Sequence, residues 1–251
     1  MSSISAIVIA ANEEQRIDTC LRSLAWADEI ILIDGESKDR TLEVASHYTQ
    51  KIHTRPFDNF ANQKNYGIDL AKSEWIFSID ADEVVTSYLA ESLRAVIKRR
   101  SSCDGFLINR ANILFGKRLR FGGQGADKVL RFFRKEKGRF DQPVHEKVKV
   151  DGKVGQLEGE LMHLSSSTIS DYLKKLNPYT SLEAQLAFRQ GLRPTILDLC
   201  LRPSLRFLYY YVLRLGFLDG YEGFLFHGLS SFHHFLKLAK VREIHERAKK
   251  I

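Results

Sequence analysis

Carboxylates crowd together at the end of an apolar run in the segment WIFSIDADE, residues 75–83. Asp80, Asp82 and Glu83 lie within four positions, where like charges repel one another unless open solvent or a cation offsets them. Asp80 and Asp82 project to the same side of an extended segment, because side chains repeat every second residue. Since Mg²⁺ commonly binds one or two carboxylates together with substrate phosphates, the pair predicts a platform for a divalent ion that carries a diphosphate. The sequence indicates no partner for Glu83.

A second isolated carboxylate, Asp34, ends another apolar run in ILIDGESKDRT. A carboxylate there can accept hydrogen bonds from a base edge or from ribose hydroxyls. Helix capping is the alternative role, although Ser37 or Asp39 can provide that cap instead. The sequence has no G-x-G-x-x-G and no G-x-x-x-x-G-K-[ST], so neither a dinucleotide-binding Rossmann site nor a P-loop is supported. A nucleotide site built on carboxylates and a metal remains.

Apolar runs alternate with helical segments through the first hundred residues. The expected strands are 5–10, 29–34, 51–54 and 75–80. The expected helices are 13–25, a segment capped near 37–39 that ends near 48, 61–71 and 89–99. Repeated units of this length predict a parallel sheet with helices on both faces. Because ligands bind outside the carboxyl ends of such strands, Asp34 and Asp80 are both expected to face that crevice.

The pattern changes from about residue 104 onward. Antiparallel strands are expected there, with turns at Gly116 and at 137–138, followed by a helical segment 168–190 that Pro178 interrupts. The chain of 251 residues is 44% hydrophobic and 27% charged, which excludes a disordered protein and allows a full core. These patterns divide the chain into regions 1–105, 106–167 and 168–251.

The cysteines indicate a reducing environment. Cys20, Cys103 and Cys200 are far apart and lack the spacing of metal ligands, and the N-terminus carries no apolar signal segment. We therefore expect a cytoplasmic protein. Cys20 lies on the apolar face of its predicted helix and is expected to be a core residue rather than a reactive thiol.

The basic charge is concentrated near the C-terminus. The net charge is +7, and residues 201–251 hold nine Lys and Arg against four Asp and Glu. The same region is rich in aromatic residues, but its charge-free runs are shorter than the ~18–20 apolar residues that a membrane span requires. The pattern favours helices at an anionic membrane surface, with ordinary amphipathic helices packed on the domain as the alternative. A nucleic-acid-binding protein is a remote alternative, because no nucleic-acid motif is present. No oligomeric state is indicated.

Several segments, taken together and in order, resemble a known family. IVIAANEE, IILIDGESKDRT and FANQKNYGIDLAKSEWIFSIDADE resemble the nucleotide-sugar half of family 2 glycosyltransferases. VLRFFRK, QPVHE, LMHLSSSTISDYLKKLNPYT and LRFLYYYVLRLGFLDGYEGF resemble the bacterial lipopolysaccharide-core β-1,4-glucosyltransferases of that family. The resemblance implies an α/β protein of the GT-A fold, with a Rossmann-like mixed sheet and a C-terminal helical appendage. Residues 1–105 would bind the nucleotide sugar, 106–167 the acceptor, and 168–251 the membrane surface.

The resemblance also implies roles for individual residues. It assigns nucleotide-sugar binding to Ala10, Asn12, Glu14, Asp34, Gln63, Lys64, Asp80 and Ala81. It assigns Mg²⁺ or Mn²⁺ binding to Asp82 and His163, and catalytic roles to Glu146 and Arg131. For His163, a satisfied, half-buried histidine at a strand end is an equal alternative. Arg131 would neutralise the leaving diphosphate or an acidic acceptor.

Inverting transfer requires a base that deprotonates the acceptor hydroxyl. Glu146 in the segment PVHE is the expected base. Related enzymes more often carry an Asp in a Glu-Asp pair, whereas this chain has His145 followed by Glu146. Asp141 and Asp127 are the weaker candidates.

The predicted activity is metal-dependent, inverting transfer of a sugar from a nucleotide diphosphate sugar to a lipid-linked saccharide. The resemblance favours UDP-glucose as donor and lipopolysaccharide core as acceptor, at the inner face of the cytoplasmic membrane. Transfer to a polyprenyl phosphate is the alternative with the same fold. A nucleotidyltransferase is disfavoured, because the first strand leads to AANEE rather than to a glycine-rich phosphate loop.

Overall fold

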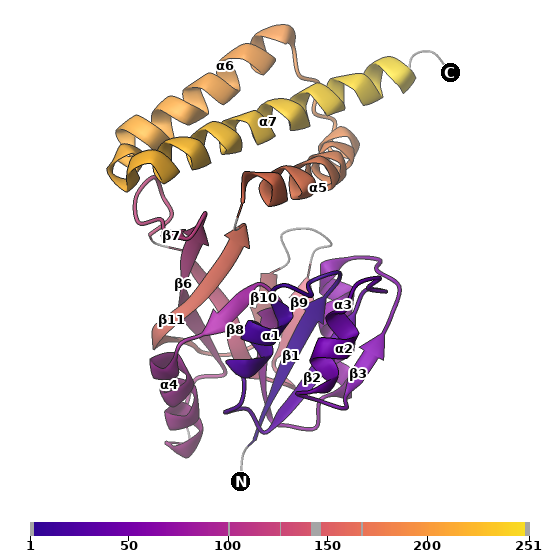
Figure 1. Ribbon diagram of the computed structural model, residues 1–251, viewed down its shortest axis with the longest axis vertical. Coiled ribbons are helices and arrows are strands. Elements are labelled where there is room, and N and C mark those ends of the chain that lie inside the picture. Colours follow the sequence, from indigo (N-terminus) through magenta and orange to yellow (C-terminus); the bar gives the residue numbers. More distant parts are fainter. Residues whose placement is uncertain (1–2, 100, 126, 142–146, 167, 249–251) are drawn as a thin grey trace. The chain divides into compact units, whose positions relative to one another are not determined.

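The computed structural model describes residues 3–99, 101–125, 127–141, 147–166 and 168–248 (Figure 1). The chain divides into two compact units. The first comprises Met1–Arg110 and Asp127–His163, and the second comprises Ala111–Ala126 and Leu164–Ile251. The division falls inside strands β6 (Gly105–Leu114) and β11 (Val154–Ser166). The regions 1–105, 106–167 and 168–251 were expected on functional grounds and stay a prediction.

The first unit is built on a mixed sheet. Its parallel part consists of β1 (Ile4–Ala10), β2 (Glu29–Asp34), β3 (Ile52–Thr54) and β4 (Trp75–Asp80), in the order β3-β2-β1-β4. The sheet continues through β8 (Lys128–Arg134), β6, β11 and β5 (Glu83–Val85), and β8 runs antiparallel to β4. Beside it, β9 (Gly138–Asp141) pairs with β10 (Lys147–Val150). The predicted class, a Rossmann-like mixed α/β sheet with C-terminal helices, is confirmed.

Helices cover both faces of this sheet. They are α1 (Ile17–Arg22), α2 (Thr41–Ser46), α3 (Phe60–Leu70) and α4 (Ser87–Lys98). Residues of β1 alternate between the faces: Ile4 and Val8 pack in a core cluster with residues of α1 and α4, whereas Ile7 packs in another with residues of α3. Cys20 is fully buried in the first of these clusters, as expected for a core residue.

The helix expected over residues 13–25 is shorter than predicted. Its helical part begins at Ile17 and ends at Arg22. The N–H groups of Glu13 and Glu14 bond to Thr41 Oγ1 and Asp39 Oδ2 at 2.8 and 3.1 Å. Those side-chain contacts hold residues 13–16 in a turn that joins the ends of β1 and β2. The predicted boundaries were wrong, and the sequence could not show these contacts because the acceptors lie about 25 residues away.

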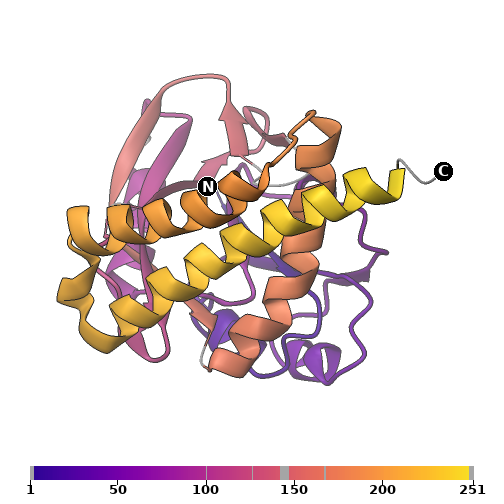
Figure 2. The ribbon, with the colours of Figure 1, turned by 90° about the horizontal axis from the view of Figure 1, so that it is seen from above.

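The second unit is largely helical. Its helices are α5 (Ile169–Arg189), α6 (Ile196–Phe207), the π-helix Leu208–Leu213, the 3₁₀-helix Gly216–Asp219 and α7 (Gly220–Ala248). Figures 1 and 2 both show α6 running beside α7. Among the described helices, none has both the length and the hydrophobicity that crossing a membrane demands.

The interruption expected at Pro178 is not seen, because α5 is continuous through it. A proline removes one helical hydrogen bond and loosens the backbone around it. Beside the proline, Lys240 of α7 donates from its Nζ to the Asn177 carbonyl at 2.8 Å and to the Thr180 hydroxyl at 2.7 Å. These bonds join α5 to α7 beside the proline.

Residues 111–126 belong to the second unit although they lie in sequence between the two segments of the first. They include β7 (Lys117–Arg118), which pairs with β6 in a hairpin that turns at Gly116, as expected. The buried carboxylate of Asp219 accepts hydrogen bonds from the N–H groups of Arg120 and Phe121 at 3.0 and 2.9 Å. Lys117 Nζ donates to the Asp219 carbonyl at 2.6 Å. These bonds fasten the hairpin to the start of α7.

Candidate functional site

Asp80 ends β4 between two cationic side chains. Lys64 Nζ lies 2.8 Å from Asp80 Oδ1, and an Arg131 guanidinium nitrogen lies 2.5 Å from Oδ2. Lys64 and Arg131 are buried, while the Asp80 side chain is 27% exposed. Burial raises the pKa of Asp80, but Arg131 and Lys64 outweigh it and hold that pKa well below its usual value. Asp80 is therefore an ionised carboxylate in a fixed position.

Glu83, which the sequence left without a partner, is the buried anchor of this cluster. It is fully buried, and its Oε1 lies 3.2 Å from Arg131 and 3.5 Å from Arg110. Its Oε2 accepts the Asp80 backbone N–H at 3.0 Å. Arg110 also pairs with Asp127 at 2.7 Å. Glu83 thus fixes both the backbone at the end of β4 and the cation that holds the Asp80 side chain.

Asp82 faces a histidine from a distant strand. Pairing of β5 with β11 places His163 opposite Glu83 in the ladder, and His163 Nε2 lies 3.5 Å from Asp82 Oδ2. Burial lowers the pKa of His163, but the hydrogen bond and charge of Asp82 raise it overall above its usual value. The structure therefore brings together the residues expected to bind a metal, Asp82 and His163.

The ends of β1 and β2 lie next to the end of β4. In the sheet, Ile9 pairs with Asp80 and Ala10 pairs with Asp34, so these strand ends share one edge. The buried Asp34 carboxylate accepts the Ser37 hydroxyl at 2.5 Å and the Ser37 N–H at 3.1 Å. Asp34 therefore reaches the expected edge, and in this structure it also stabilises the turn that follows β2.

Asn12 and Glu14 connect the loops that follow β1 and β2. Asn12 has a φ of 56°, and its Oδ1 accepts the Lys38 N–H at 2.7 Å. Glu14 Oε2 accepts the Arg40 N–H at 3.1 Å. Asparagine tolerates the left-handed backbone region better than most residues, so it suits this turn. Both side chains lie in the loops at the strand edge, as expected.

Gln63 and Lys64 lie on α3, which Asn59 caps by accepting the Asn62 N–H at 2.8 Å. Gln63 is 2% exposed, and its Nε2 donates to the Arg55 carbonyl at 3.1 Å. Its Oε1 is buried and finds no hydrogen-bond partner in the part of the chain that the structure describes. A buried acceptor without a donor is costly, and a ligand N–H is one group that would satisfy it.

Lys64 lies over the Phe140 ring, with its Nζ 5.2 Å from the ring centroid. The aromatic face and Asp80 together compensate the burial of this ammonium group. Ala81 is 4% exposed between the two aspartates. These placements bring Lys64, Asp80, Ala81 and Asp82 together.

The expected base, Glu146, lies outside the described residues, as does His145. Of the weaker candidates, Asp127 pairs with Arg110, and Asp141 forms an ion pair with Lys149. Arg131 is only 6% exposed and contacts Asp80 and Glu83. Its position behind these carboxylates suits a residue that orients Asp80, and its expected contact with a diphosphate stays a prediction.

The donor set suits a divalent cation that substrate helps to bind. Within the described ranges no group of three or more His, Cys, Asp and Glu side chains is arranged to hold a metal ion. Asp82 and His163 would supply a carboxylate oxygen and an imidazole nitrogen, a combination that Mn²⁺ accepts and that Mg²⁺ accepts less readily. Phosphate oxygens and water would complete the coordination, as is usual for such ions.

Comparisons with known proteins match most of the chain to glycosyltransferases. The model of glycosyl transferase family 2 matches residues 5–148. The lipopolysaccharide core biosynthesis glycosyltransferase LpsC of Rhizobium meliloti (strain 1021) is 29% identical over 250 residues, covering 96% of this chain and 93% of LpsC. An uncharacterized glycosyltransferase of Rickettsia typhi (strain ATCC VR-144 / Wilmington) is 28% identical over 268 residues, covering 100% of this chain and 90% of the relative.

Solved structures with a related chain trace were also found. Staphylococcus aureus TarS in complex with UDP-GlcNAc is 13% identical with a TM-score of 0.49, covering 99% of this chain and 92% of that one. Mycobacterium tuberculosis glucosyl-3-phosphoglycerate synthase in complex with Mn²⁺ and UDP-glucose is 19% identical with a TM-score of 0.37, and the match covers 44% of each chain.

Proposed function

Because this chain belongs to glycosyl transferase family 2, we propose that it transfers glucose from UDP-glucose to a hydroxyl of a lipid-linked saccharide such as lipopolysaccharide core. The family makes it a glycosyltransferase of the GT-A fold, in agreement with the mixed sheet. The lipopolysaccharide-core relative supports the class of acceptor. The segments that resemble β-1,4-glucosyltransferases support glucose and inversion.

The observation that carries the proposal is the contrast between the two aspartates after β4. Asp80 is held by Lys64 and Arg131, whereas Asp82 faces His163. In our proposal Asp80 accepts hydrogen bonds from the ribose, and Lys64 provides a positive charge near the phosphates. Asp82 and His163 would hold Mn²⁺ or Mg²⁺, which when bound offsets the charge that develops on the leaving diphosphate.

The remaining steps are assigned to residues around this edge. Asp34, Ala10, Asn12 and Glu14 would line the nucleoside pocket, and the buried Gln63 Oε1 would accept a ligand N–H. Glu146 would take the proton from the acceptor hydroxyl as the sugar passes through an oxocarbenium-like state. We place the enzyme at the inner face of the cytoplasmic membrane, as a peripheral protein whose second unit contacts the anionic surface.

The metal role is tested by comparing Asp82→Asn with Asp69→Asn. Asp69 is an exposed carboxylate on α3 that pairs with Arg139, so its variant controls for the loss of one surface charge. The assay measures glucose transfer from UDP-glucose to purified lipid-linked core saccharide, with Mn²⁺, with Mg²⁺ and with a chelator. We expect Asp82→Asn to lose more than about 100-fold, because even outer-shell partners of a metal contribute about 10–100-fold. Turnover that survives both the chelator and Asp82→Asn contradicts the metal role.

The base is tested separately with Glu146→Gln. Transfer should fall by about 10²–10⁴-fold, the usual contribution of general base catalysis, while binding of UDP-glucose measured by calorimetry is unchanged. If transfer is retained, Glu146 is not the base. If UDP-glucose does not bind the native protein at all, the donor assignment is wrong.

A further inference from the structure

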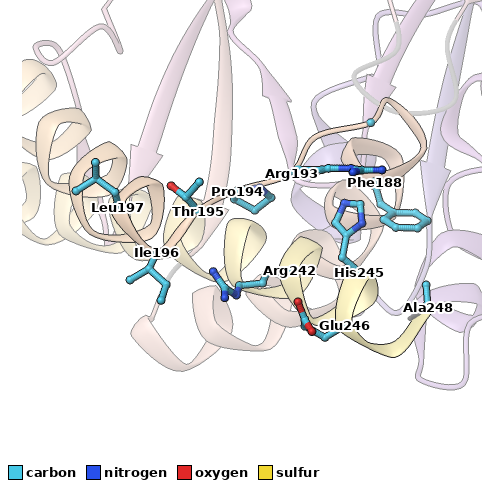
Figure 3. A pocket seen from close by; sticks show the side chains of 11 residues that line it. Phe188, Arg193, Pro194, Thr195, Ile196, Leu197, Arg242, His245, Glu246 and Ala248 are labelled. Atoms are coloured by element: carbon cyan, nitrogen blue, oxygen red, sulfur yellow. The ribbon is translucent and has the colours of Figure 1, made fainter. Parts of the chain in front are cut away.

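A pocket of about 870 Å³ lies in the second unit, between the segment that connects α5 to α6 and the C-terminal part of α7 (Figure 3). Arg193 enters it from the connecting segment and Arg242 from α7. His245 also lines the pocket, and its Nε2 lies 2.8 Å from the Leu192 carbonyl oxygen. In Figure 3 the Arg193 side chain extends toward Phe188 and the Arg242 side chain toward Ile196, on opposite sides of the pocket.

Arg193 and Arg242 have no partner among the described residues, whereas several other basic residues of this unit do. Arg202 pairs with Asp198 at 2.7 Å and Lys237 with Glu183 at 3.3 Å. Within the described residues, Arg193 and Arg242 form no ion pair, hydrogen bond or ring contact. Glu246 is the acidic residue in the lining. Two guanidinium groups in the lining of a pocket with one carboxylate favour an anionic ligand.

The start of α6 contributes less to this charge than its position suggests. The Thr195 hydroxyl accepts the Asp198 N–H at 3.2 Å, and the Asp198 carboxylate accepts the Thr195 N–H at 2.8 Å. This capping box uses N–H groups that an anion would otherwise contact. The arginines are therefore the main source of positive charge in the pocket.

The rim of the pocket is apolar and open to solvent. Ile196 and Leu197 line it and are 66% and 65% exposed. The exposed face of α6 continues at helical spacing through Leu201, Leu205 and the adjoining Leu208. A continuous apolar face of this kind marks an interaction surface, and paired with basic residues it suits the interface of an anionic bilayer.

We propose that this pocket binds the phosphate of an anionic lipid headgroup, while Ile196, Leu197 and the exposed face of α6 enter the bilayer interface. The proposal refines only the membrane contact of the proposed function. Arg193 and Arg242 donate hydrogen bonds to the phosphate oxygens. A nucleic acid would satisfy the arginines but would leave the exposed leucines in water, so the apolar rim favours a lipid.

The test measures flotation of the full chain with vesicles of phosphatidylcholine, with and without phosphatidylglycerol. The pocket variant is Arg193→Gln/Arg242→Gln, and the matched control is Arg189→Gln/Arg247→Gln, which removes the same charge from the same unit outside the pocket lining. If binding depends on net charge alone, both double variants should lose the same affinity for anionic vesicles. That loss would be up to about 30-fold, since each basic residue near such a membrane contributes about 1 kcal/mol. If the pocket binds a headgroup phosphate, the pocket variant should lose at least about 10-fold more vesicle affinity than the control.

Two further measurements distinguish a lipid headgroup from free phosphate as the ligand. Leu197→Gln should weaken vesicle binding without changing the thermal shift produced by inorganic phosphate, because the residue contacts the bilayer rather than the anion. Equal losses in both double variants overturn the proposal. The proposal is also overturned if inorganic phosphate shifts the melting temperature while vesicle binding is the same in all variants. No sugar donor, acceptor or metal is present, so failure here leaves the transferase assignment untouched.

Discussion

Replacing Arg131 by Met should destabilise the first unit strongly. The Arg131 side chain is 8% exposed and contacts both Asp80 and Glu83. Without it, Asp80 keeps Lys64 at 2.8 Å, but the fully buried Glu83 keeps only the longer contact of 3.5 Å to Arg110. Removing one partner of a buried ion pair costs about 3–5 kcal/mol, since the other charge stays buried and poorly compensated. We expect a loss of this size in the free energy of unfolding.

The measurement can be restricted to the unit that carries the site. The chain's tryptophans, Trp26 and Trp75, both belong to the first unit, so their fluorescence during urea denaturation reports on that unit rather than on the helices. For a unit of this size, 3–5 kcal/mol corresponds to a melting temperature lower by roughly 10 °C. Far-ultraviolet circular dichroism of the native state checks that the variant still folds.

A second substitution distinguishes ionic compensation from simple loss of packing. Glu83→Gln removes the buried negative charge, while the amide oxygen of the new side chain can take the place of Glu83 Oε2 and accept the Asp80 N–H. In Arg131→Met/Glu83→Gln no charge is left poorly compensated, so the double variant should recover a large part of the stability that Arg131→Met loses. A loss below about 1 kcal/mol in Arg131→Met, or losses that simply add in the double variant, would refute this reasoning.

Two further predictions concern packing and acid stability. Gly67→Ala should destabilise the first unit by about 1–3 kcal/mol, because the new Cβ would lie 2.3 Å from Ile7 Cγ2. Urea denaturation followed by tryptophan fluorescence measures this loss. A variant as stable as the native protein would contradict the close packing of α3 on β1. In the second unit, burial raises the pKa of Glu183, but His233 and Lys237 outweigh it and lower that pKa from 4.5 to about 2. The stabilisation is therefore complete above about pH 4.5 and is lost as the pH falls to about 2, on the order of 3 kcal/mol in all. Circular dichroism of urea unfolding across this range should show the loss in the native protein and little of it in Glu183→Gln; a pH-independent difference between the two would rule it out.

The strands of the first unit could be predicted well from sequence. Glu29–Asp34 and Trp75–Asp80 begin and end where their apolar runs do, because each strand is buried on both faces and is bounded by polar residues. The same reasoning placed Asp34 and Asp80 at one edge of the sheet, since neighbouring parallel strands align their carboxyl ends. Strand positions alone did not predict the proximity of Asp82 and His163. Only the pairing of β5 with β11 brings His163 to Asp82, and in the sequence the resemblance alone indicated that these residues act together.

The charged cluster behind Asp80 could not be predicted. Arg131 and Arg110 lie 48 and 27 residues from Glu83 in sequence, and the register of antiparallel strands decides which cation arrives there. The sequence next to Glu83 holds no cationic residue that would indicate its partner. Likewise, the bond from Lys240 to the Asn177 carbonyl of α5 joins residues 63 apart in sequence. In each case the missing information was a long-range contact.

The inclusion of residues 111–126 in the second unit has a consequence for recombining relatives. The Lys117, Arg120 and Phe121 contacts to Asp219 tie this internal hairpin to the C-terminal helices. A chimera that exchanges only the segment from Leu164 onward would join one parent's hairpin to the other parent's helices. Mismatched partners would then surround the buried Asp219, with no N–H groups assured for it. Acceptor or membrane preference should therefore be transplanted as a two-segment cassette that carries 111–126 together with 164–251.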